Sequence, residues 1–201
     1  MQSNAVIGEP SLGAGCAAIL AVLKLFDLAL RELCTQDRPL PLDDEVALNK
    51  KLKVRVLAAK NAHGVPERLR IDTQSEVYPS PDSEDPTGKP DFRVTFEPDF
   101  DDESCYLAVE CKRIEETHAR KLPRYYVLNG VCRFAAEAYG HYYGWGIMLG
   151  YVVSGTVPNA VTAVRRYLNK KKVETALTAG LRTCPSLSGF GDTTCCSDHR
   201  T

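Results

Sequence analysis

Asp91, Glu110 and Lys112 are the side chains in this sequence best suited to catalysis. Apolar and polar residues alternate from Tyr106 to Lys112, which predicts a β-strand with one face in the core. Glu110 and Lys112 would project from the same face of that strand, whereas on a helix they would point about 200° apart at roughly 100° per residue. The strand therefore lets a carboxylate and an amine share one site.

Metal-dependent cleavage of a phosphodiester is the chemistry that these residues could perform. Mg²⁺ prefers oxygen ligands and keeps several waters, so Asp91, Glu110 and the backbone carbonyl of Cys111 are enough protein ligands. The ion, Mg²⁺ or else Mn²⁺, would stabilise charge on the phosphate and make a bound water nucleophilic near neutral pH. Lys112 would orient or deprotonate that water, or stabilise the charge of the phosphorane. The alternative is a solvated strand face, because an acid followed two residues later by a lysine is common.

Pro90-Asp91, followed after a hydrophobic strand by Glu110-Cys111-Lys112, resembles the motif of the PD-(D/E)XK nuclease superfamily. The resemblance implies an α/β fold with a restriction-endonuclease-like core, in which α-helices flank a mixed β-sheet. It also implies a Mg²⁺-dependent endonuclease that hydrolyses phosphodiester bonds in DNA, in a bacterial defence or mobile-element system. Two alternatives stay open: an RNA nuclease, and a catalytically inactive nuclease-like module that binds nucleic acid or a protein partner.

Glu45 is the candidate for a third carboxylate. Asp43, Asp44 and Glu45 stand at the predicted start of a helix. In the superfamily a glutamate on the first helix often completes the metal site, and the resemblance places Glu45 in that role. The same acids would also cap the helix and favour its dipole, and the two interpretations stay open. We expect five residues to form a partly apolar face of this helix: Val46, Leu48, Leu52, Val54 and Val56.

Basic and aromatic side chains provide the candidates for contact with nucleic acid. The net charge of −1 gives no bulk attraction, so binding must depend on local patches such as Lys50, Lys51 and Lys53. Downstream, helical spacing of apolar residues predicts a helix around residues 125–135 that carries Tyr126 and Arg133. Arginine binds phosphate through a bidentate fork, and tyrosine can donate a hydrogen bond or stack on a base. A structural role is the alternative for Tyr126.

The 201 residues, 44% of them hydrophobic, predict a single domain. We expect a packing helix within residues 1–40 and the nuclease-like core over residues 41–201. The predicted order in the core is a second helix, a strand over 70–77, a hairpin of strands over 92–96 and 106–112, a helix, a strand over 147–153 and a final helix from near Pro158. Glu76, at the end of the first strand, could face the same cleft or be exposed.

Eight cysteines without a CxxC pair predict reduced thiols, and four of them lie in apolar patterns: Cys16, Cys34, Cys111 and Cys132. Four C-terminal residues form a loose group of zinc-type ligands that matches no standard zinc module: Cys184, Cys195, Cys196 and His199. The segment 197–200 instead resembles a Ser-x-His segment that precedes the last core strand in a subset of the superfamily. The sequence stops at Thr201, so two alternatives stay open: the core lacks that strand, or the sequence is a shortened form of the protein.

A polar stripe, composed of Lys24, Asp27, Arg31 and Glu32, interrupts the apolar stretch Cys16–Leu33. This pattern predicts a packing helix and no membrane span. The N-terminal residues also lack the basic region of a secretory signal, which predicts cytoplasmic residence. For partners, we expect nucleic acid, with a homodimer or a protein partner in addition, because many nucleases cut both strands as dimers.

Overall fold

Thirteen short or long elements form the described part of the chain. The computed structural model describes residues 14–36, 39–62, 69–73, 76, 88–115, 122–136, 143–183 and 195–199. The α-helices are α1 (Ala14–Gln36), α2 (Glu45–Ala62), α3 (Leu122–Tyr126), α4 (Cys132–Ala135) and α5 (Val157–Lys170). The strands are β1 (Leu69–Thr73), β2 (Phe92–Phe96), β3 (Leu107–Ile114), β4 (Gly146–Val152), β5 (Leu177–Thr183) and β6 (Cys195–His199). A 3₁₀ turn, η1 (Glu97–Asp99), follows β2, and a π-helical segment, η2 (Val127–Val131), joins α3 to α4.

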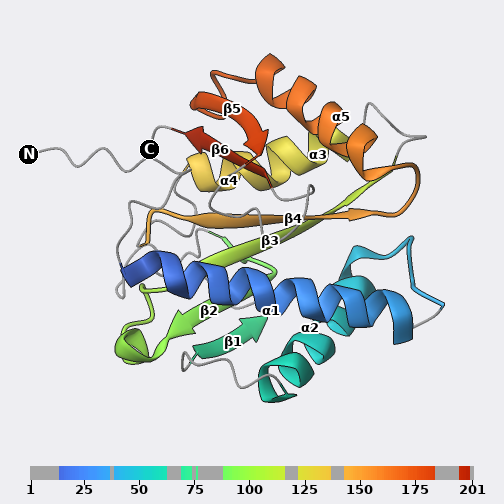
Figure 1. Ribbon diagram of the computed structural model, residues 1–201. Helices are drawn as coiled ribbons and strands as arrows, with labels where there is room; N and C mark the ends of the chain where they lie inside the picture. Colours follow the sequence, from blue (N-terminus) through green and yellow to red (C-terminus); the bar gives the residue numbers. More distant parts are fainter. Residues whose placement is uncertain are drawn as a thin grey trace, which may run out of the picture.

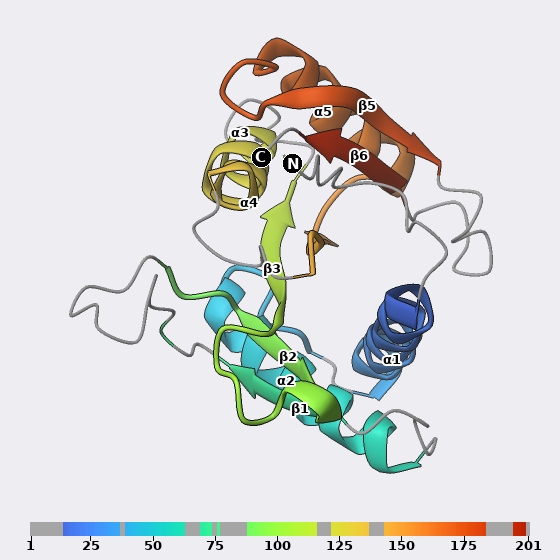
Figure 2. The same cartoon turned by 90° about the vertical axis from the view of Figure 1, so that its left-hand side faces the viewer.

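A four-stranded mixed sheet, in the order β1-β2-β3-β4, forms the centre of the molecule (Figure 1). Neighbouring strands are antiparallel from β1 to β3, while β4 runs parallel to β3. Helices α1 and α2 pack on the sheet in one hydrophobic cluster, and α3, η2 and α5 belong to a second cluster (Figure 2). The predicted α/β class, with helices flanking a mixed sheet, is confirmed.

Strand β3 is buried on both faces, because helices cover the sheet from both sides. Leu107, Val109 and Cys111 belong to the cluster with α1 and α2. Ala108 packs with Phe134 of α4, and Glu110 on the same face is only 2% exposed. The expectation of one apolar and one polar face was therefore too simple. The alternation of side chains holds, but the second face is also interior, which makes the burial of Glu110 costly unless it is paired.

Helix α2 buries a narrower face than predicted. Leu48, Leu52 and Val56 are four residues apart and lie in the core, whereas Val46 and Val54 are exposed. A helix turns about 100° per residue, so residues two positions from the buried row point away from the sheet. The prediction that Val46 and Val54 share the apolar face was wrong. Cys34, expected in the core, is likewise exposed near the end of α1.

Several boundaries differ from those expected. Strand β1 ends at Thr73, and Glu76, which was predicted within the strand, is exposed and lies outside it. Strand β3 continues to Ile114, because β4 pairs with it in parallel as far as the pair of Ile114 with Val152. Two strands that we did not predict, β5 and β6, follow α5 and form a separate antiparallel pair.

His199 in β6 is held inside the protein. Its Nδ1 lies 2.6 Å from the carbonyl oxygen of Thr175, and its Nε2 lies 2.9 Å from Ser197 Oγ. A carbonyl oxygen only accepts, so Nδ1 carries the proton and Ser197 donates to Nε2. Both ring nitrogens are engaged, which does not support the zinc interpretation of the C-terminal residues. Of the other candidates, Cys184 lies outside the described residues.

The described helices include none that is long and apolar enough to cross a membrane. The longest, α1, has an ion pair between Arg31 and Asp27, two residues of the predicted polar stripe. This is the polar stripe expected of a helix that packs on one side only.

Gly146 provides a test of the packing between β4 and α4. A Cβ at this position would lie 2.2 Å from the ring of Phe134, which is itself buried. We expect Gly146→Ala to lower the free energy of unfolding by about 1–3 kcal/mol, as overpacking does. Urea unfolding measures the effect. Gly180→Ala is the matched control, because its Cβ would meet its nearest neighbour at an ordinary 3.5 Å. Equal stabilities for the two variants would contradict the expectation.

Candidate active site

Four oxygen atoms from three parts of the chain surround the ammonium of Lys112. Its Nζ lies 2.7 Å from the carbonyl oxygen of Cys111 and 2.8 Å from Glu110 Oε1. Glu45 Oε1 lies 3.1 Å away and Asp91 Oδ2 lies 3.7 Å away. These are the candidate ligands named from the sequence, and the fold brings all of them together. Lys112 is also largely buried, with its side chain 13% exposed.

The local structure explains how each part reaches this position. Glu110 and Lys112 project from one face of β3, as their spacing predicts. Asp91 stands immediately before β2, the strand that pairs with β3. Its Oδ2 accepts a hydrogen bond of 2.8 Å from the backbone N–H of Cys111. The antiparallel hairpin thus holds the Asp91 carboxylate against β3, the strand that carries Glu110 and Lys112.

Glu45 and Asp44 divide the two roles that the sequence left open. Asp44 caps α2, because its carboxylate accepts a 3.0 Å hydrogen bond from the N–H of Ala47. Glu45 turns toward β3 instead: its Oε2 accepts a 3.0 Å bond from the N–H of Arg113, while its Oε1 faces Lys112. The two acids are adjacent in sequence, but Asp44 binds the backbone of its own helix and Glu45 binds the backbone of β3. The capping function belongs to Asp44.

Two residues that the sequence analysis did not select support Asp91. The side-chain amide of Asn49 donates a 2.8 Å hydrogen bond to Asp91 Oδ1. The hydroxyl of Tyr151, on β4, donates a 2.7 Å bond to the amide oxygen of Asn49. Asn49 stands one turn after Glu45 on α2, beside Leu48 and Leu52 in the core. A polar residue within an apolar helix face was the signal that could have identified it.

Of the candidates for nucleic-acid contact, Arg133 lies nearest the carboxylates. Its Nη1 is 3.4 Å from Glu110 Oε1, and its side chain is 45% exposed. A guanidinium with one side toward the buried glutamate and the other toward solvent can also bind a phosphate. Tyr126 does not share this position. Its hydroxyl donates to the carbonyl oxygen of Met148 at 3.4 Å, and its ring packs in the cluster of α5, which is the structural alternative.

The lysines of α2 are spread around the helix. Lys53 continues the row of Glu45 and Asn49 at intervals of four residues, and its ammonium donates to Thr73 Oγ1 at 2.9 Å. Lys50 is exposed and Lys51 is half-buried. Of the three lysines, the fold therefore brings Lys53 onto the helix face that carries Glu45. Its partner Thr73 is the last residue of β1.

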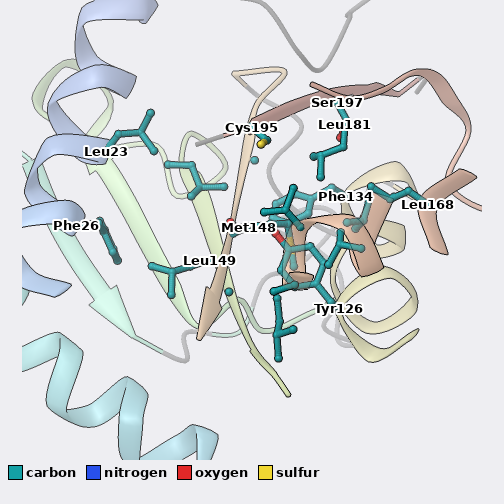
Figure 3. Close-up of a pocket in the computed structure, with 18 of the residues that line it drawn as sticks. Leu23, Phe26, Tyr126, Phe134, Met148, Leu149, Leu168, Leu181, Cys195 and Ser197 are labelled. Carbon is teal, nitrogen blue, oxygen red and sulfur yellow. Dashed lines mark hydrogen bonds between the residues drawn. The ribbon is translucent and has the colours of Figure 1, made fainter. Parts of the chain in front are cut away.

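A cavity of about 410 Å³ lies next to β4 (Figure 3). Its walls are mainly apolar and come from α1, β4 and the helices α3 to α5; they include Leu23, Phe26, Tyr126, Met148 and Leu149. None of the three carboxylates is among its lining residues. The cavity and the polar cluster are therefore separate features of the fold.

Comparison with known proteins adds no family to this geometry. No family model, curated protein or solved structure matches this chain.

Charge is unevenly balanced in the cluster. Burial, followed by the negative charge of Glu110, raises the pKa of the Asp91 carboxyl from its ordinary 3.8 to about 6. Burial alone would lower the pKa of Lys112, but its hydrogen bond to Glu110 and the charges of Glu110, Asp91 and Glu45 outweigh burial and raise it. Lys112 is therefore an ammonium near neutral pH. In this state it donates hydrogen bonds to the surrounding oxygens.

The oxygen atoms of the cluster are of the type that binds a hard divalent cation, but they lie farther apart than such an ion requires. Three carboxylates and a backbone carbonyl are the oxygen ligands that Mg²⁺ and Mn²⁺ prefer. Around the ammonium, however, these oxygens lie 2.7–3.7 Å from the central nitrogen, whereas Mg²⁺ requires about 2.0–2.1 Å. Consistently, no three His, Cys, Asp or Glu side chains among the described residues are gathered as a ready metal site. A metal would have to displace the Lys112 ammonium and draw the oxygens inward.

The raised pKa of Asp91 can be tested in the metal-free protein. We expect the ¹³C resonance of its carboxyl to titrate with a midpoint at about pH 6. Glu110→Gln should lower this midpoint, because it removes a neighbouring negative charge. The folded protein holds this proton more tightly than the unfolded chain, so the stability due to Asp91 is complete below its ordinary pKa and is lost as the pH rises through about 6. A midpoint near 4 in both proteins would contradict the burial described here.

The separate roles of Asp44 and Glu45 predict opposite results for two neighbouring substitutions. Asp44→Ala removes the cap and should lower the free energy of unfolding by about 1 kcal/mol without altering the cluster. Glu45→Gln keeps the helix capped and should leave the melting temperature nearly unchanged while it weakens Mn²⁺ binding. Thermal melting and Mn²⁺ titration of both variants check this division. A larger loss of stability in Glu45→Gln than in Asp44→Ala would reverse it.

Proposed function

We propose that this chain is a Mg²⁺-dependent endonuclease that cleaves DNA, with a restriction-endonuclease-like core. The observation that carries the proposal is the convergence of Glu45, Asp91, Glu110 and the Cys111 carbonyl on one cationic position, occupied by the Lys112 ammonium. Three of these groups come from the β2–β3 hairpin and one comes from the start of α2. The mixed sheet flanked by helices agrees with the architecture that the Asp91 and Glu110-x-Lys112 motif implies.

The three carboxylates and the Cys111 carbonyl would hold the ion. A bound divalent ion supplies charge stabilisation for the phosphate and lowers the pKa of a coordinated water. Asp91 can serve only in its ionised form, and near neutral pH most of it is ionised because its pKa is about 6. Two backbone N–H groups orient two of these carboxylates: that of Cys111 donates to Asp91, and that of Arg113 donates to Glu45.

Lys112 and Arg133 would act on the substrate. Lys112 is protonated, so its ammonium donates hydrogen bonds to the attacking water or to the charged phosphate oxygens and stabilises the charge that develops there. Arg133, half exposed beside Glu110, would bind a phosphate of the backbone through its guanidinium. Lys50, Lys51 and Lys53 on α2 would add electrostatic attraction along the nucleic acid. The two roles differ: Lys112 serves the reaction, while the lysines of α2 serve affinity.

A second candidate is a catalytically inactive module that binds nucleic acid or a protein partner. The observation that favours it is the ammonium itself, which pairs with the carboxylates and fills the position that a metal would need. An inactive module would keep this arrangement in all conditions. An enzyme would exchange it for a metal at millimolar Mg²⁺ or Mn²⁺.

One assay separates these candidates and identifies the substrate. The purified chain is incubated with supercoiled plasmid, linear duplex, single-stranded DNA and RNA, each with Mg²⁺, Mn²⁺ or EDTA. Cutting of DNA that requires the metal supports the proposal, and cutting of RNA alone would move the substrate to RNA. Binding without cutting, with either metal and with a melting transition that proves folding, would favour the inactive module.

A further inference from the structure

A buried chain of hydrogen bonds runs from β4 through α2 to the carboxylate before β2. Tyr151 and Asn49 are 8% and 6% exposed, and the bond between them is buried. Asn49 in turn contacts Asp91 at 2.8 Å. The three residues come from separate elements and are far apart in sequence. Their contact is therefore a product of the packing of α2 on the sheet.

The Asp91 carboxylate, at one end of this series of hydrogen bonds, determines which group donates and which accepts in each bond. An ionised carboxylate only accepts, so Asn49 must present its amide nitrogen to Asp91. The amide oxygen of Asn49 then faces Tyr151, whose hydroxyl must donate. Burial, followed by the neighbouring thiol of Cys111, raises the pKa of this hydroxyl, so it keeps its proton at neutral pH. Tyr151 thus selects the amide orientation that suits an ionised Asp91.

Packing alone does not account for Asn49. Its neighbours on the buried face of α2 are Leu48, Leu52 and Val56, and an apolar residue could fill the same space. A buried amide costs free energy unless both its ends are bonded, and here both are. The consequence is that each oxygen of Asp91 has its own donor: Asn49 holds Oδ1, and the N–H of Cys111 holds Oδ2.

We propose that Asn49 and Tyr151 form a positioning relay for Asp91. The relay prevents rotation of the carboxylate and keeps Oδ2 turned toward the cationic position at Lys112 Nζ, 3.7 Å away. This inference rests on the proposed function, in which Asp91 is a metal ligand. Asn49 and Tyr151 are positioning residues, because they act through Asp91 and touch neither substrate nor metal. Outer partners of this kind are worth about 10–100-fold in metal affinity where they have been removed.

Two substitutions at Asn49 and one at Tyr151 test the relay. Asn49→Leu removes both polar ends, while Asn49→Asp keeps the acceptor for Tyr151 and replaces the donor to Asp91 with a second carboxylate. Tyr151→Phe keeps the ring and removes the donor to Asn49. Tyr167→Phe, at a half-buried tyrosine that packs against the cluster of α5, is the matched control.

The first readout needs no metal: the amide resonance of Cys111 in a ¹⁵N–¹H spectrum reports whether Asp91 Oδ2 stays bound to that N–H. We expect this resonance to move upfield and broaden in both Asn49 variants, to move less in Tyr151→Phe and to stay in place in Tyr167→Phe. An unchanged resonance in a folded Asn49→Leu protein would overturn the relay.

The second readout is the affinity for Mn²⁺, measured at one pH by electron paramagnetic resonance of the free ion. We expect both Asn49 variants to bind Mn²⁺ about 10–100-fold more weakly, with a smaller loss in Tyr151→Phe. Wild-type affinity in both Asn49 variants would overturn the role of the relay in metal binding. If the unmodified protein binds no Mn²⁺ while the Cys111 resonance still moves in Asn49→Leu, the proposed function fails and the positioning of Asp91 by Asn49 stands.

Discussion

Glu110→Gln should abolish metal-dependent cleavage of DNA while the protein remains folded. Glu110 is the most deeply buried of the three carboxylates, at 2% exposed, and it contacts both Lys112 and Arg133. The amide has the same shape but no charge, so it binds a hard divalent ion far more weakly. We expect the cleavage rate to fall by about three orders of magnitude or more, the scale on which loss of a charge-stabilising group affects catalysis. A single-turnover assay with Mg²⁺ measures the rate.

Glutamine is chosen so that a loss of activity reports the lost charge and not a packing defect. An alanine at position 110 would leave a cavity in the interior, whereas glutamine keeps the volume, and Lys112 keeps Glu45 and Asp91 as ionic partners. Glu174→Gln is the matched control, because it makes the same chemical change at an exposed pair with Lys171. Asp91→Ala is expected to abolish cleavage in the same way. Full activity of Glu110→Gln with an intact melting transition would remove Glu110 from the mechanism.

Lys112→Met should slow cleavage by about 10²–10³-fold, because it removes the ammonium that stabilises charge on the phosphate. Methionine has similar length and no charge, and DNA affinity should change little, since the ammonium is buried and the lysines of α2 remain. Affinity for Mn²⁺ should rise, because the ammonium no longer competes with the metal for the same oxygens. Single-turnover rates, DNA binding and Mn²⁺ titration together measure these three effects.

A stability measurement separates this prediction from a general defect. Without its ammonium, the cluster holds three carboxylates that repel each other, so metal-free Lys112→Met should melt below the unmodified protein. Saturating Mn²⁺ should restore more stability to the variant than to the unmodified protein. Lys171→Met, at the exposed pair with Glu174, should show none of these changes. Unchanged turnover in Lys112→Met would contradict the role assigned to this residue.

Sequence periodicity predicted the elements that carry the cluster, with errors mainly at their ends. The hairpin strand Phe92–Phe96 was predicted at its observed boundaries, and β3 and β4 within two residues. These strands are in the interior, where alternation and apolar content are strong signals. Strand β1 was predicted to reach residue 77, whereas it ends at Thr73. Strands β5 and β6 were missed; among the described residues they form a two-stranded sheet separate from the main one.

The π-helical segment η2 is a second feature that spacing could not reveal. Leu128, Val131 and Ala135 fit an ordinary helical pattern, yet the structure has a wide turn at Val127–Val131. Gly130 lies in that turn, where a Cβ would collide with the end of Met148 on β4. The close approach of η2 to the sheet determines where the following residues stand, including Arg133. Such an approach depends on the partner strand and has no local signature.

By itself, the sequence determined the chemistry that the cluster can hold. Asp91, Glu110, Lys112 and the Cys111 carbonyl follow from residue type and strand spacing, and the resemblance to a nuclease motif added Glu45. These inferences succeed because side chains alternate between the two faces of a strand, so residues two positions apart lie on the same face.

Only the tertiary structure decided how those groups meet. It turned Glu45 toward β3 while Asp44 capped the helix, and it placed the ammonium of Lys112 among the oxygens. It also brought Asn49 and Tyr151, which are distant in sequence, into contact with each other and Asp91. The physical reason is that burial gives each polar group a large cost unless it finds a partner, and the partner is chosen by the packing of whole elements.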